Sequence, residues 1–174
     1  HECTVFVFTL GLTESWVNVA GGYAYGLCPG VAGGQYDAGV HAFHNMGFAD
    51  CIADLNAAIA CLQAQNPAVR ILLTVSPVNL VATMEPHGAL QSSVASKSIL
   101  RAVADACVRQ HANVDYFPSY EIIAGPQARG QFYSADGREV TPAGVKLVME
   151  SFFRSRVTGN AVAAPVTNVN WQSQ

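Results

Sequence analysis

Three short apolar runs, separated by segments long enough for a helix, most constrain the fold of this 174-residue chain. The runs are Val5–Leu10, Ile71–Val75 and Val114–Phe117, and a glycine or proline follows each within two residues. Uninterrupted runs rich in β-branched and aromatic residues are typical of strands that are covered on both faces, as in a parallel sheet. We therefore expect the three runs to be neighbouring parallel strands.

Helical patterns fill the spaces between the runs. Apolar residues recur at three- and four-residue spacing over 48–62, from about Ser93 to Gln110, and over 145–152. Thr141 is a suitable N-cap for the last helix, with Pro142 at its first position. This alternation predicts an α/β fold, a three-layer α/β/α domain with a parallel sheet over residues 1–158, followed by a tail at 159–174.

Residues 20–45 interrupt the alternation and hold seven of the fifteen glycines. We expect a long ordered loop there, because such a loop in a compact domain is more often functional than idle. His41 and His44 lie in this segment three residues apart, without further ligands at metal spacing, and the sequence has no CxxC or HExxH motif. We therefore expect neither a metal nor a cofactor.

Composition excludes several function classes. The formal net charge is −3, and the only local excess of positive charge is Arg154 with Arg156, so we expect no nucleic-acid partner. No segment is apolar and long enough to predict a membrane span. Five cysteines are an odd count and three fall on apolar faces, which indicates buried free thiols and a cytoplasmic location.

Polar residues follow each expected strand or precede the last helix. Ligands of open α/β sheets bind beyond the carboxyl ends of the strands, so these residues are predicted to share one cleft. His87 is the only histidine in a suitable place for a general base. The full set is Gly11, Thr13, Glu14, Ser76, His87, Tyr120, Asp136 and Glu139.

Each of these residues also has a structural interpretation. Asp136 and Glu139 could simply complement the dipole of the last helix, and the others could cap strands and begin turns. Lys97, between Ser96 and Ser98, is expected to be a surface or loop-anchoring residue. A GxSxG motif is absent from the sequence, which excludes the standard α/β-hydrolase elbow.

Six stretches of the chain carry a family resemblance. They are FTLGLTESW (8–16), CPG (28–30), LLTVSPVNLVAT (72–83), SKSILRA (96–102), DYFPSYEI (115–122) and DGREVTPAGVKLVMESFF (136–153). Together they resemble the GSCFA family, a bacterial group similar to the SGNH esterases and acyltransferases. The resemblance implies an SGNH- or flavodoxin-like fold.

The resemblance also implies a nucleophilic serine in a Gly-Ser-Cys-Phe-Ala block directly after the first strand. That block does not occur in this sequence. The expectation is therefore that the serine belongs to a segment absent from this chain and that the sheet is incomplete on its N-terminal side. An N-terminal fragment or a second copy of the chain would then complete the sheet.

The remaining motifs of the resemblance assign further roles. Gly11-Leu-Thr-Glu14 is similar in position to the Gly-x-Asn-Asp block of the superfamily, so Thr13 takes the place of its oxyanion donor. From their place after the strands, Gly11, Ser76 and Tyr120 are expected as further oxyanion or substrate-binding residues. The Asp-x-x-His block of the superfamily is matched by Asp136-Gly-Arg-Glu139, so the imidazole is expected from His87, with Glu14 as a further carboxylate of the catalytic set. The implied function is an esterase or acyltransferase for small-molecule or carbohydrate esters. The alternatives are a non-catalytic glycan- or peptide-binding domain, or an assembly protein that retains the fold.

Overall fold

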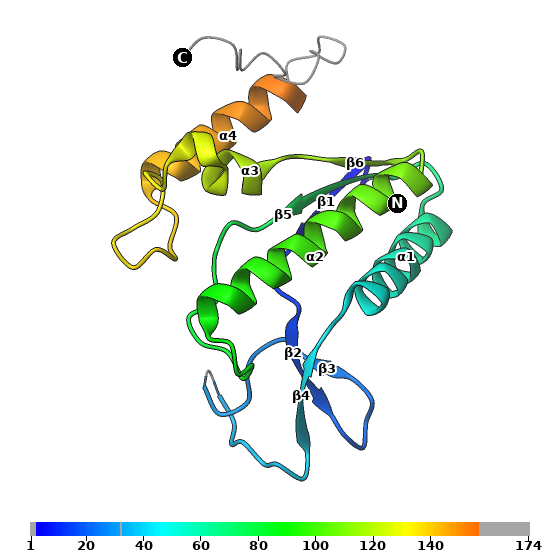
Figure 1. Cartoon of the computed structure of the whole chain (residues 1–174). Helices are drawn as coiled ribbons and strands as arrows, with labels where there is room; N and C mark the ends of the chain where they lie inside the picture. The colour runs from blue at the N-terminus through cyan, green and yellow to red at the C-terminus, as the bar shows by residue number, and fades with distance from the viewer. Residues whose placement is uncertain (1–2, 32, 157–174) are drawn as a thin grey trace.

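A parallel sheet of three strands forms the centre of the molecule. The computed structural model describes residues 3–31 and 33–156 (Figure 1), so the expected tail at 159–174 lies outside the described residues. The strands are β1 (Val5–Leu10), β5 (Arg70–Val75) and β6 (Val114–Tyr116), in the order β1-β5-β6, and both pairs are parallel. The three predicted strands and their parallel pairing are confirmed.

In the described part of the chain, four α-helices accompany this sheet: α1 (Phe48–Gln65), α2 (Ala89–Gln110), α3 (Ser119–Ala124) and α4 (Pro142–Arg156), with a 3-10 turn, η1, at Pro126–Ala128. Thr141 caps α4 as expected, since its Oγ1 accepts the N–H of Gly144 at 3.3 Å. Helix α2 begins one turn before Ser93. The apolar stripe did not reveal this turn because Leu90 is exposed there and the buried positions that follow are serines.

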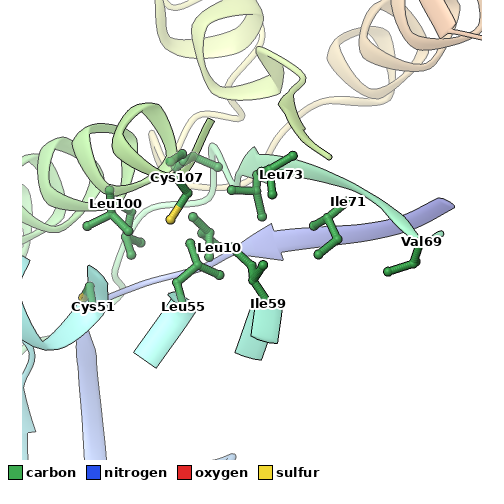
Figure 2. Packing of buried hydrophobic residues seen from close by; sticks show 13 residues of the cluster. Leu10, Cys51, Leu55, Ile59, Val69, Ile71, Leu73, Leu100 and Cys107 are labelled. Atoms are coloured by element: carbon green, nitrogen blue, oxygen red, sulfur yellow. The ribbon is translucent and has the colours of Figure 1, made fainter. Parts of the chain in front are cut away.

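The main core lies between the sheet and the pair α1 and α2 (Figure 2). From β5, alternate residues Ile71, Leu73 and Val75 point into this core. Thr74 points to the opposite face, where its hydroxyl bonds to Ser119 of α3. Since α3 in turn contacts α4, the two pairs of helices cover opposite faces of the sheet. The predicted three-layer α/β/α arrangement is confirmed.

A second, antiparallel sheet projects from this body (Figure 1). It consists of β2 (Glu14–Asn18), β3 (Ala24–Tyr25) and β4 (His41–Asn45), in the order β3-β2-β4. The interpretation of residues 20–45 as a loop was therefore wrong for β3 and β4. These strands are short and mix polar with aromatic residues, so their pairing rests on cross-strand contacts that hydrophobic alternation does not reveal.

Strand β1 lies at one edge of the parallel sheet. Its outer edge has no strand partner among residues 3–31 and 33–156, and Val5 and Val7 are 47% and 51% exposed. The expectation that both faces of this run are covered is wrong for β1 in this chain. The reason is that α3 packs against β5 rather than β1, so the face of β1 that carries Val5 and Val7 stays open.

Two of the five cysteines are buried, rather than the expected three. Cys51 and Cys107 lie in the main core, whereas Cys3, Cys28 and Cys61 are exposed, and all five are free thiols. Burial raises the pKa of the Cys51 and Cys107 thiols. Among the helices that the structure describes, none has the length and apolar character needed to cross a membrane.

Candidate functional site

The connection from β1 to β2 is anchored at the carboxyl edge of the parallel sheet. Thr13 is buried, and its backbone N–H donates to Ser96 Oγ on α2 at 2.8 Å. The Thr13 hydroxyl donates to Asn45 Oδ1 at 2.7 Å. This hydroxyl therefore already has an acceptor, and its predicted role as an oxyanion donor requires it to leave Asn45.

The long loop from β5 to α2 closes over this connection. Glu14 accepts the hydroxyl of Thr83 at 2.5 Å, and Glu85 accepts the side-chain amide of Asn45 at 2.9 Å. At the start of the loop, Leu80 N–H donates to Ser93 Oγ on α2 at 2.9 Å. The loop is thus fixed to both the small sheet and α2.

The turn before α4 packs against the same loop. Tyr133 donates its hydroxyl to Pro77 O at 2.8 Å, Asn79 donates to Gly137 O at 3.1 Å, and Arg138 Nε donates to Asn79 O at 3.2 Å. The structure therefore brings the predicted segments around Ser76 and Asp136 together.

The two carboxylates of this turn lie at its exposed rim. Asp136 Oδ1 accepts the backbone N–H groups of Arg138 at 2.9 Å and Glu139 at 3.2 Å. These two bonds hold the pKa of Asp136 below its ordinary value, and the bond from the Arg138 N–H has the larger effect. Glu139 Oε1 lies 3.5 Å from Arg138 Nη1. Asp136 is therefore ionised at neutral pH.

His87 and Tyr120 lack the hydrogen bonds that join the β5–α2 loop to the turn before α4 in the described residues. His87 is exposed, and no hydrogen bond joins it to Asp136 or Glu139 within the part of the chain that the structure describes. Tyr120 is half-buried and packs against the main core, next to Ser119, which bonds to Val75 O at 2.9 Å. The catalytic role of His87 and the substrate-binding role of Tyr120 stay predictions.

A pocket of about 300 Å³ opens between these segments. Gly11 and Ser76, both predicted site residues, line it together with Lys97 of α2 and Arg138 of the turn. Most of the remaining wall is the apolar part of the β5–α2 loop. The pocket therefore combines an apolar wall with two cationic side chains.

Lys97 is the most unusual group of this pocket. Its side chain is only 1% exposed, and its Nζ donates to Gly11 O at 2.8 Å. The expected loop-anchoring role is confirmed by this bond, whereas the expected surface position is wrong. Burial lowers the pKa of the Lys97 ammonium from 10.5 to about 8.

Sequence reasoning missed the polar face of α2 that holds the site together. Ser92, Ser93, Ser96 and Lys97 are all buried there. They extend the buried stripe of Leu100 and Val103 toward the start of the helix. The sequence signal for this face was the small polar residues at helix positions that continue the core stripe. Buried polar side chains need hydrogen-bond partners, so such a face indicates contacts with neighbouring segments.

Within residues 3–31 and 33–156, no three histidine, cysteine, aspartate or glutamate side chains gather into a group able to hold a metal ion.

The Ser96 anchor gives a first testable prediction. Ser96→Ala removes the acceptor of the buried Thr13 N–H, so we expect it to lower the free energy of unfolding by about 1–3 kcal/mol. Urea denaturation of both proteins measures this difference. Ser98→Ala is the control, since Ser98 is exposed and its hydroxyl donates only to Val94 O of its own helix. Equal losses in the two variants would contradict the anchoring role.

The Lys97 ammonium gives a second prediction, on pH dependence. The unfolded chain holds this proton up to pH 10.5, whereas the folded protein releases it near pH 8. Between these values the unfolded state binds more protons, so the contribution of Lys97 to stability rises with pH. We expect the wild type to gain about 2–3 kcal/mol relative to Lys97→Met between pH 8 and 10, measured by urea denaturation. Parallel stability curves for the two proteins would refute this.

Comparison with protein families gives one match: the model of the GSCFA family matches residues 1–152. Neither the curated proteins nor the solved structures give a match.

Proposed function

The chain belongs to the GSCFA family, and on this premise we propose that it carries the site of an SGNH-like esterase or acyltransferase. The proposed substrates are small-molecule or carbohydrate esters. The observation that supports this proposal is the pocket at the carboxyl edge of the parallel sheet, lined by Gly11 and Ser76. Connections from β1 and β5 meet there with the turn that precedes α4.

The proposed acid–base pair is His87 with Asp136. His87 has no competing hydrogen bond within the described part of the chain. Asp136 uses Oδ1 for both backbone bonds, so Oδ2 is available to accept an imidazole N–H. In this proposal His87 takes the proton of the attacking hydroxyl, and ionised Asp136 orients and stabilises the imidazolium.

The attacking serine is proposed to belong to a segment outside this chain, as the family resemblance implies. The open edge of β1 supports this proposal, because unpaired backbone groups beside exposed apolar side chains can accept a further strand. An N-terminal segment or a second copy of the chain would supply that strand. The free thiols support a further proposal, that the domain works in the reducing cytoplasm of a bacterium.

The experiment that tests this function is an ester-hydrolysis assay on the full-length protein. We expect turnover of p-nitrophenyl acetate and covalent labelling of one serine by a fluorophosphonate, both abolished by replacing that serine with alanine. A full-length protein with neither turnover nor labelling would overturn the proposed chemistry.

A second function, glycan binding without catalysis, is favoured by one face of the small sheet. Trp16 lies directly opposite Tyr25 and Phe43 in the strand register, so the three rings share a face. Tyr36 is largely exposed, and its ring contacts the Trp16 ring edge-on, with 5.5 Å between the two ring centroids. Aromatic faces with a polar rim suit the flat apolar face of a sugar ring. A wild-type protein that binds no soluble oligosaccharide would exclude this function, and a Trp16→Ala protein that binds them as well as the wild type would exclude this face as the site.

A further inference from the structure

Lys97 is a buried cation that has no carboxylate partner among residues 3–31 and 33–156. The chain has only two lysines, and this one lies almost fully inside the molecule. An ammonium group has three donors, and the acceptor found for Lys97 Nζ in the described residues is Gly11 O. A carbonyl oxygen bears no net charge, so the positive charge of Lys97 stays uncompensated. Burying such a charge is costly unless an anion accompanies it.

The walls around Lys97 contain no acidic residue. The lining residues include Arg138 as a second cation, and neither aspartate nor glutamate is among them. Arg138 lies beside two carboxylates of its own turn: its backbone N–H donates to Asp136 Oδ1 at 2.9 Å, and its Nη1 lies 3.5 Å from the exposed Glu139 Oε1. Glu14 is bound to Thr83 instead. The charge of Arg138 is therefore offset by its own turn, whereas within the described residues the charge of Lys97 has no carboxylate beside it.

The pocket also offers a neutral donor. Ser76 Oγ accepts the N–H of Val78 at 3.2 Å. This bond leaves the hydroxyl proton of Ser76, for which the described residues supply no acceptor, able to donate to a ligand. Lys97, Arg138 and Ser76 thus line the same pocket as Leu12 and the apolar residues of the β5–α2 loop.

From this arrangement we propose that the pocket binds the oxyanion group of a small organic acid or phosphate ester, with Lys97 as its principal charged contact. The anion supplies the counter-charge that the protein itself does not provide, and the apolar wall receives the organic part of the ligand. The inference deepens the proposed function, because it makes the substrate anionic, and it rests on that function for the identity of this pocket as the substrate site.

The test measures binding of simple anions by NMR titration of the full chain, with inorganic phosphate and acetate as separate probes at pH 7. We expect saturable shifts of the amide signals of residues around Gly11 and Ser76 with at least one of the two anions. A stronger response to phosphate would identify a phosphoryl ligand, and a stronger response to acetate a carboxylate. An absence of saturable shifts with both anions would overturn the proposal.

Two variants assign the binding to the pocket. Lys97→Met keeps the volume of the side chain and removes its charge, so we expect affinity to fall at least about tenfold. Lys146→Met, at the exposed lysine of α4, is the matched control and is expected to bind like the wild type. If Lys97→Met does not fold, Arg138→Gln at the rim is expected to weaken binding at least about threefold. Equal affinity in the wild type and in the pocket variant examined would refute the proposed site.

Because binding is measured without turnover, the two proposals can fail separately. A protein that binds the anion but hydrolyses no ester would overturn the esterase and keep the anion site. A protein that hydrolyses neutral esters while binding neither anion would overturn the anion site alone.

Discussion

Replacing His87 with alanine in the full-length protein is expected to lower ester turnover by about a hundredfold or more. The loss of a positioned general base removes a contribution of about 10² to 10⁴ to the rate. His87 is exposed and has no hydrogen bond within the described residues, so the variant is expected to fold with wild-type stability. The measurement is kcat for p-nitrophenyl acetate, with the unfolding midpoint determined on the same samples.

His44→Ala is the matched control for this experiment. His44 is also exposed, and it lies opposite Ser15 in the register of the small sheet, away from the face that carries Trp16. We expect its turnover to equal that of the wild type. A His87→Ala protein with undiminished kcat would contradict the assignment of His87 as the base.

Asp136→Asn separates the charge of Asp136 from its role in the turn. Asparagine keeps a side-chain oxygen able to accept the N–H groups of Arg138 and Glu139, whereas the negative charge is lost. We therefore expect kcat of Asp136→Asn to fall, as kcat of His87→Ala does, while the free energy of unfolding changes little. Full activity of this variant would show that Asp136 only holds the turn.

Leu73→Ala is expected to lower the free energy of unfolding by about 3–5 kcal/mol. Leu73 is fully buried on the central strand of the parallel sheet, in the core that α1 and α2 cover (Figure 2). Truncation there removes apolar burial and leaves a cavity that strands on both sides prevent from collapsing. Urea denaturation monitored by circular dichroism measures the loss.

The same substitution at Leu90 provides the control. Leu90 lies in the first turn of α2 and is 79% exposed. We expect Leu90→Ala to change stability by less than about 0.5 kcal/mol. Similar losses at the two leucines would mean that β5 is not the centre of the core.

Local sequence determined the parallel sheet and most of its helices. The runs Val5–Leu10 and Ile71–Val75 are apolar, β-branched and closed by glycine or proline, so their state follows from composition within a few residues. The start of α4 followed from Thr141 and Pro142 in the same way. These features act within a single turn or strand, which is why they can be predicted without tertiary contacts.

The small antiparallel sheet depended on partners that are distant along the chain. Strand β4 reads as a mixture of polar and aromatic residues, and it becomes a strand because Phe43 meets Trp16 across the register. Trp16 and Phe43 are far apart in sequence, and the intervening glycines suggested only a loop. No local pattern encodes that pairing, because its stabilisation comes from contacts between the two strands.

In the candidate site, too, some features follow from local sequence and others from tertiary packing. The rule that ligands bind at the carboxyl edge of parallel strands selected Gly11 and Ser76, which line the pocket, because their positions follow from where the strands end. The other predicted site residues are not among the lining residues that the structure describes, and their roles stay predictions. Lys97 lies on the middle of a helix, where sequence alone predicts an exposed side chain. Only the packing of α2 beneath the β1–β2 connection buries its ammonium against Gly11 O and lowers its pKa. Desolvation depends on everything that surrounds a group, so the charge of this pocket was decided by the tertiary structure.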